Sequence, residues 1–159
     1  MMFVTWKISS FLLEQTASAF TSGTHEVFVI WTASRQQAGA FCTIRRCVVP
    51  QQTPGFSAGG VYVHIEGDEL NRIQFDNYDH GERSVVQLHT HPSADVRMSR
   101  LDRSWEVVSH VGALSIIVPY YGRVGLRGFP GVHVYERDPD DWRLWTRAEI
   151  EQRLRVIDG

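Results

Sequence analysis

The chain has 159 residues, a formal net charge of −2 at pH 7, and 43% hydrophobic and 21% charged residues. This length fits one domain with a single well-sized hydrophobic core. The charge is close to neutral, and the sequence has no basic stripe, glycine-rich phosphate loop or internal repeat. These features exclude nucleic acid and nucleotides from the leading ligands.

Two features bear on the compartment in which the protein works. Residues 1–7 lack the charged and apolar regions of a signal peptide, and no apolar run approaches the roughly 20 residues of a membrane helix. The two cysteines, Cys42 and Cys47, have neither Cys-x-x-Cys spacing nor a local histidine, and their odd separation places them on opposite faces of a regular strand. We therefore expect two reduced thiols in a cytoplasmic protein without membrane association.

Hydrophobic periodicity and turn residues predict alternating strands and helices from the start of the chain. The N-terminal part is expected to contain strands at residues 3–7, 26–34, 40–49 and 61–65, and helices at residues 9–20 and 68–75. The intervening residues 50–60 are rich in Gln, Pro, Gly and Ser, and we expect them to form a loop.

The C-terminal part continues this alternation. A turn at residues 77–81 leads into a strand that ends in two histidines. The elements expected after it are a helix at 99–111, strands at 114–119 and 132–137, a glycine-rich loop at 120–131 and a helix at 147–157. The last helix opens with a capping box, Thr146 and Glu149. Together the elements predict an α/β fold, a three-layer α/β/α sandwich with a mixed sheet.

The most informative segment of the sequence combines two histidines with a later aspartate. His89-Thr90-His91-Pro92 is followed, after six residues, by Ser99-Arg100-Leu101-Asp102. Two histidines two apart in a strand point to the same face of the sheet. Asp102 lies one turn into the helix that Ser99 begins, where it can turn back toward the histidines. The spacing therefore predicts three metal ligands: His89, His91 and Asp102.

Two imidazoles and one carboxylate form a ligand set suited to Zn²⁺, and three protein ligands leave a fourth tetrahedral position open for water. Such an open position indicates catalysis, because zinc lowers the pKa of water from about 15.7 toward 7. The chemistry then needs a proton carrier, and we expect it to be Glu26. This carboxylate leads an almost wholly apolar strand, where a partly desolvated position beside a cation suits a general base.

Three other residues near Glu26 or upstream of the histidines are alternatives for this role. Glu66 and Glu82 both fall in polar stretches that are typical of a helix start and a turn. His25 precedes Glu26 and points to the opposite face of a regular strand, so we expect it at the surface. We therefore favour Glu26.

The order of these motifs resembles the signature of the JAMM (MPN-plus, or JAB) zinc metalloproteases. The resemblance in element order covers roughly residues 6–134, and the histidine-to-aspartate portion matches without a gap. It implies a cytidine-deaminase-like sandwich in which His89, His91 and Asp102 bind one zinc ion. It further implies that Glu26 is the acid/base and that Ser99 helps to stabilise the tetrahedral intermediate.

The resemblance also implies a class of substrate. JAMM enzymes cut isopeptide or peptide bonds after the C-terminus of ubiquitin-like proteins. The chain is similar to the compact prokaryotic type found in bacterial conjugation or antiviral operons. Its loops at residues 51–60 and 120–131 are short, and they correspond in order to regions where eukaryotic deubiquitinases carry larger insertions. The leading prediction is an isopeptidase that acts on a ubiquitin-like protein or its conjugates. The oligomeric state stays open.

Other interpretations stay open at this point. A JAMM peptidase of this size can process a sulfur-carrier protein or act in a phage-tail or cell-wall setting, and an inactive MPN scaffold uses the fold only for assembly. Taken separately, His-x-His also fits two polar residues on a solvated face, and Ser-x-x-Asp is a capping box in its own right. Sequence does not separate a catalytic Ser99 from one that only caps a helix.

Overall fold

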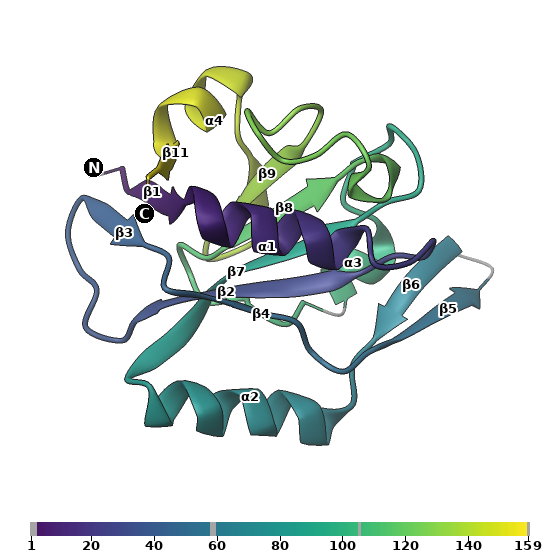
Figure 1. Ribbon diagram of the computed structural model, residues 1–159, viewed down its shortest axis with the longest axis horizontal. Helices are drawn as coiled ribbons and strands as arrows, with labels where there is room; N and C mark the ends of the chain where they lie inside the picture. Colours follow the sequence, from purple (N-terminus) through teal and green to yellow (C-terminus); the bar gives the residue numbers. More distant parts are fainter. Residues whose placement is uncertain (1–2, 58–59, 105, 159) are drawn as a thin grey trace.

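A computed structural model of the protein describes residues 3–57, 60–104 and 106–158. Its centre is a six-stranded mixed sheet with the strand order β10-β9-β8-β7-β2-β4 (Figure 1). The strands are β2 (Phe28–Ser34), β4 (Arg46–Val48), β7 (Glu82–Thr90), β8 (Leu114–Val118), β9 (His133–Arg137) and β10 (Trp142–Leu144). β7 runs antiparallel to β2 and parallel to β8, so its C-terminal end lies in the middle of the sheet.

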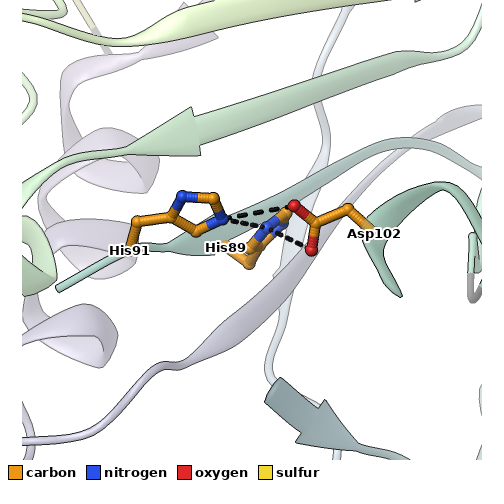
Figure 2. Close-up of side chains that lie close together, drawn as sticks. All are labelled: His89, His91 and Asp102. Atoms are coloured by element: carbon orange, nitrogen blue, oxygen red, sulfur yellow. Dashed lines mark hydrogen bonds and ion pairs between the residues drawn. The ribbon is translucent and has the colours of Figure 1, made fainter. Parts of the chain in front are cut away.

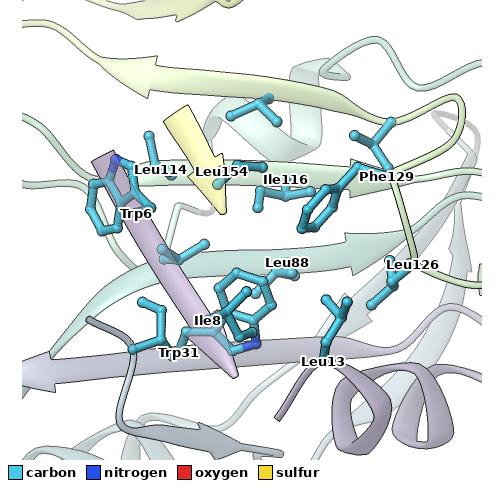
Figure 3. Packing of buried hydrophobic residues seen from close by; sticks show 14 of the residues in the cluster. Trp6, Ile8, Leu13, Trp31, Leu88, Leu114, Ile116, Leu126, Phe129 and Leu154 are labelled. Carbon is cyan, nitrogen blue, oxygen red and sulfur yellow. The ribbon is translucent and has the colours of Figure 1, made fainter. Parts of the chain in front are cut away.

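One face of this sheet is covered by helices and by a second, parallel sheet. The covering elements are α1 (Ser10–Phe20), α4 (Arg147–Arg153) and a three-stranded sheet of β11 (Leu154–Ile157), β1 (Thr5–Ser9) and β3 (Phe41–Thr43). Side chains from these elements meet those of β2, β7 and β8 in the main hydrophobic core (Figure 3). Trp31, for example, is 1% exposed, and its indole N–H donates to Thr16 of α1.

The opposite face of the sheet packs against α2 (Gly67–Asp79) and against the segment that follows β7. Ile73 of α2 meets Phe28 and Ile30 in one cluster, and Val96 and Met98 meet Ile117 in another. Helices thus lie on both faces of a mixed sheet, which confirms the predicted α/β sandwich. In the described part of the chain no helix is long and apolar enough to cross a membrane.

A β-bulge interrupts the pairing of β2 with β7. Trp31 pairs with Val86 and Thr32 pairs with Ser84, so Val85 is an extra residue in β7. Both Val85 and Val86 are buried in the main core. A bulge of this kind changes which side chains face each side of the sheet.

Two predictions for residues 40–60 are wrong. The single strand predicted at 40–49 is two strands in different sheets, with Cys42 in β3 and Cys47 in β4, both as free thiols. The predicted loop at 50–60 instead contributes β5 (Thr53–Ser57), which forms a two-stranded hairpin with β6 (Gly60–His64). Its proline, Pro54, is tolerated because a two-stranded sheet leaves outward-facing backbone groups unpaired.

The helix predicted at residues 99–111 is also shorter than expected. α3 spans Arg100–Ser104, and residue 105 lies outside the described residues. The backbone N–H groups of Val107 and Val108 donate to the buried side chain of Gln87, at 3.0 and 2.9 Å. Because these groups bond to a side chain of β7, they do not continue a helical ladder.

The C-terminal helix likewise ends before its predicted boundary. Its capping box is present, with Thr146 and Glu149 bonding each other's backbone N–H. The helix stops at Arg153, and the apolar residues predicted to extend it form β11, which pairs in parallel with β1. Leu154 enters the core from this strand, because pairing with a neighbouring strand outweighs local helical periodicity here.

Candidate metal centre

The structure brings His89, His91 and Asp102 together at the C-terminal end of β7 (Figure 2). The two imidazole Nε2 atoms are 3.1 Å apart. Nε2 of His89 lies 3.1 Å from Asp102 Oδ1, and Nε2 of His91 lies 3.2 Å from Asp102 Oδ2. Residues from the end of a central strand and from α3 thus converge on one point. This agrees with the alternation of side chains along the strand and with the predicted position of Asp102 in the first turn of a helix.

The tautomer of His91 is set by a backbone carbonyl. Its Nδ1 lies 2.8 Å from the carbonyl oxygen of Asp95, which can only accept, so Nδ1 carries the hydrogen. The lone pair of neutral His91 is therefore on Nε2, the atom that faces Asp102. His89 is held differently: its ring stacks at 9° on that of Phe28, and its buried Nδ1 has no hydrogen-bond partner among the described residues.

Asp102 is positioned by a capping box with Ser99. The Ser99 N–H donates to Asp102 Oδ2 at 2.8 Å, and the Asp102 N–H donates to Ser99 Oγ at 3.0 Å. Burial acts to raise the pKa of Asp102, but its polar contacts with the imidazoles of His89 and His91 outweigh it and hold that pKa well below its usual range. Asp102 is therefore a carboxylate at neutral pH.

The donor set is compatible with a divalent metal ion such as zinc. Ligand atoms about 2.0–2.1 Å from a tetrahedral centre are separated from each other by about 3.3 Å, close to the 3.1 Å between the two Nε2 atoms and the 3.1 Å between His89 Nε2 and Asp102 Oδ1. With the hydrogen of His91 on Nδ1, the lone pair of its Nε2 faces both the His89 imidazole and the Asp102 carboxylate, an arrangement that a bound cation would satisfy. A carboxylate beside both imidazoles favours the cation.

Glu26 lies at the same centre. It is 5% exposed and lines a cavity of about 40 Å³ together with Phe28, His89 and Asp102. Burial raises the pKa of Glu26 to about 7; His91 acts to lower that pKa and Asp102 to raise it. A carboxyl group with this pKa exchanges protons readily at neutral pH, which is the property a general base needs.

The backbone next to Glu26 is fixed by the residue between the two histidines. The side chain of Thr90 points away from the histidines and is fully buried. Its Oγ1 accepts from the Val27 N–H at 3.0 Å, and its own N–H donates to the Val27 carbonyl at 3.2 Å. Sequence reasoning predicts that Thr90 faces away but not that it bonds to Val27, because that contact joins residues 63 positions apart.

The three rivals of Glu26 lie elsewhere. Glu66 is highly exposed and pairs with His64. Glu82 is 2% exposed in β7, not in a turn, and its carboxylate binds Arg46 at 2.6 Å. His25 is exposed, as predicted. None of them reaches the metal centre.

Comparison with known proteins finds similarity in sequence and in fold. No protein family's sequence profile matches the chain. The chain is 29% identical over 133 residues to "Probable metalloprotease y4jG" of Sinorhizobium fredii, covering 84% of this chain and 78% of that protein. The solution structure of protein DSY2949 from Desulfitobacterium hafniense superposes with a TM-score of 0.61, at 12% identity, over 97% of this chain and 94% of that one. At that identity the second similarity concerns the fold alone.

Proposed function

We propose that the protein is a zinc-dependent peptidase of the JAMM type that cuts after the C-terminus of a ubiquitin-like protein. The observation that carries the proposal is the convergence of His89, His91 and Asp102 on a point beside the buried carboxyl group of Glu26. The similarity to a protein named as a metalloprotease supports a metallopeptidase function.

The protein's own residues have distinct roles in this reaction. When bound, zinc supplies Lewis acidity, which acidifies water and polarises a carbonyl group. His89, His91 and Asp102 would hold it, with the ring of His91 oriented by the carbonyl of Asp95. The hydroxyl of Ser99 accepts one hydrogen bond from the helix and keeps its own hydrogen, with which it can donate to the oxygen of the scissile carbonyl.

Glu26 carries the proton through the hydrolysis. Its carboxylate takes a proton from the water that attacks the peptide carbonyl, and a bond forms between the water oxygen and the carbonyl carbon. The protonated Glu26 then donates to the leaving amine nitrogen as the carbon–nitrogen bond breaks. The products are a free carboxylate and an amine, and Glu26 returns to its starting state.

The hairpin of β5 and β6 suits an extended peptide substrate. Tyr62 and Val63 of β6 line the same cavity as Glu26 and His89. Among the described residues β5 and β6 pair with each other alone, so they leave edge groups to which an extended tail can add as a further strand. A cavity of about 40 Å³ has room for little more than a water molecule or a glycine. We therefore infer cleavage after glycine.

The test is incubation with fusions in which a ubiquitin-like protein ending in glycine precedes a reporter, read by mass spectrometry. We expect cleavage directly after the glycine, loss of cleavage with a chelator, and recovery with added zinc. A second fusion replaces that glycine by leucine, which should block cleavage while binding of the folded body stays nearly unchanged. Efficient cutting of the leucine fusion, or of short unstructured peptides, would contradict the ubiquitin-like part and leave a broader peptidase.

A further inference from the structure

We propose that Gln52 is a positioning residue that fixes the start of β2, just after Glu26, and ties it to the β5–β6 hairpin. The inference rests on the proposed function, in which Glu26 carries the proton and the hairpin holds the peptide. Gln52 does not line the cavity beside the metal centre, so its effect passes through the segment it holds.

The side-chain amide of Gln52 replaces a missing strand next to β2. Its Oε1 accepts from the Phe28 N–H at 2.7 Å, and its Nε2 donates to the Phe28 carbonyl at 2.9 Å. The neighbouring strand on that side, β4, pairs with β2 only from Ile30 to Thr32. Without Gln52, both backbone groups of Phe28 would therefore lack a partner at the buried start of β2.

The start of β2 is thus held from both sides. Backbone groups alternate in direction along a strand, so Val27 bonds toward β7, where Thr90 binds it, and Phe28 bonds the opposite way, where Gln52 binds it. These contacts fix the two residues that directly follow Glu26. A carboxylate that transfers protons must be held to a fraction of an ångström, because small misplacements lower the rate steeply.

Gln52 also links this strand to the hairpin. It directly precedes Thr53, the first residue of β5, and its amide makes a third bond, to the Pro50 carbonyl at 2.9 Å. The preceding residue is also held, because the Gln51 N–H donates to the buried carboxylate of Glu69 in α2. The base of the hairpin and the start of β2 therefore move together, and a peptide docked on the hairpin is kept in register with Glu26.

The test is Gln52→Ala, with Gln51→Ala as the matched control. The control removes a neighbouring glutamine of the same size whose side chain is exposed and makes no hydrogen bond in the described structure. We expect Gln52→Ala to speed hydrogen exchange at the Phe28 amide by about tenfold or more, because the acceptor of that amide is lost. Metal affinity, measured by competition with a chelating dye, should stay within about twofold of wild type.

Activity distinguishes positioning from a purely structural role. At saturating glycine fusion, Gln52→Ala should lower kcat by about 10–100-fold. If this loss acts through Glu26, adding Gln52→Ala to Glu26→Gln should lower kcat by no more than about twofold further. Gln51→Ala should match wild type in every measurement.

Each outcome decides one part of the proposal. An unchanged hydrogen-exchange rate at the Phe28 amide in Gln52→Ala would show that Gln52 does not hold the start of β2. Two results would show that Gln52 has a structural role only. One is faster exchange at Phe28 with an unchanged kcat; the other is a double variant whose loss of kcat equals the combined losses of Gln52→Ala and Glu26→Gln. If the wild-type protein cuts no fusion, the proposed function fails by itself, and the exchange measurement still tests whether Gln52 holds the start of β2.

Discussion

His91 donates from Nδ1 to the backbone carbonyl of Asp95, and this bond leaves the lone pair of its Nε2 facing the carboxylate of Asp102. The ring is therefore set in the tautomer that a metal requires. The loop after β7 contributes directly to the centre, because Asp95 lies in the segment that joins the histidines to α3. Removing that ring removes a ligand atom already aimed at the centre.

His91→Ala should therefore abolish zinc binding and peptidase activity together, since two remaining ligands hold zinc weakly. The measurement is the zinc content of purified protein by elemental analysis. His110→Ala is the control, because it removes an exposed histidine away from the centre. Stoichiometric zinc in His91→Ala would contradict the assignment of the ligands.

Glu26→Gln should keep full zinc occupancy and lower kcat by about 10²–10⁴-fold. Glutamine preserves the size of the side chain but does not accept the proton from water. Glu66→Gln, at an exposed position, should leave kcat unchanged. Normal turnover in Glu26→Gln would remove this residue from the mechanism.

The pKa of Glu26 predicts how the stability of the metal-free protein depends on pH. Burial raises that pKa from 4.5 to about 7. Between these values the folded protein binds more protons than the unfolded chain, so its free energy of unfolding falls as pH rises. Urea unfolding of chelator-treated protein at pH 4.5, 6 and 7.5 should show this fall relative to Glu26→Gln. If the free energy of unfolding changes with pH equally in wild type and Glu26→Gln, the Glu26 carboxyl group lies in a more hydrated site.

Ser99→Ala tests whether this serine acts as more than a helix cap. Loss of the cap should lower the free energy of unfolding by about 1 kcal/mol, and loss of a donor to the carbonyl oxygen should lower kcat by up to about 10³-fold. Ser9→Ala removes the cap of α1, which is distant from the centre, and should lower stability alone. Equal and small effects on kcat in the two variants would assign Ser99 to capping only.

The buried carboxylate of Glu82 predicts a large stability difference between two adjacent arginines. Arg46 binds Glu82 at 2.6 Å and Asp76 at 2.9 Å, whereas Arg45 approaches Glu82 at 3.4 Å with a side chain 53% exposed. Arg46→Ala should cost about 3–5 kcal/mol in urea unfolding because it leaves a buried charge poorly compensated. Arg45→Ala should cost about 0–1 kcal/mol. Similar costs in both variants would mean that water reaches Glu82.

Local patterns predict the three converging side chains well. The alternation of a strand places His89 and His91 on one face, and a capping box places Asp102 in the first turn of a helix. These relationships span a few residues, so the sequence carries them directly. The fold class follows in the same way from the alternation of strands and helices.

The residues that hold the centre in place are not predictable from local patterns. Gln52, Thr90 and Gln87 each bond to backbone 20 or more positions away. The same long-range pairing explains why residues 50–60 form part of a hairpin and why the helices after Ser99 and Arg147 end early. In each case a partner distant in sequence satisfies backbone groups that a local pattern assigns to a loop or a helix.

The extra residue in β7 decides which way the histidines point. Before it, Glu82 and Ser84 point to the side of the sheet on which α2 lies; after it, the odd-numbered Gln87 and His89 do. If β7 alternated regularly from Glu82, with Val85 not accommodated as a bulge, every motif letter would be intact, but both imidazoles would turn into the apolar interior and Leu88 would point outward. Two chains with an identical His-x-His-Pro can thus differ completely in metal binding. The phase of the strand, set four residues upstream, makes these histidines ligands.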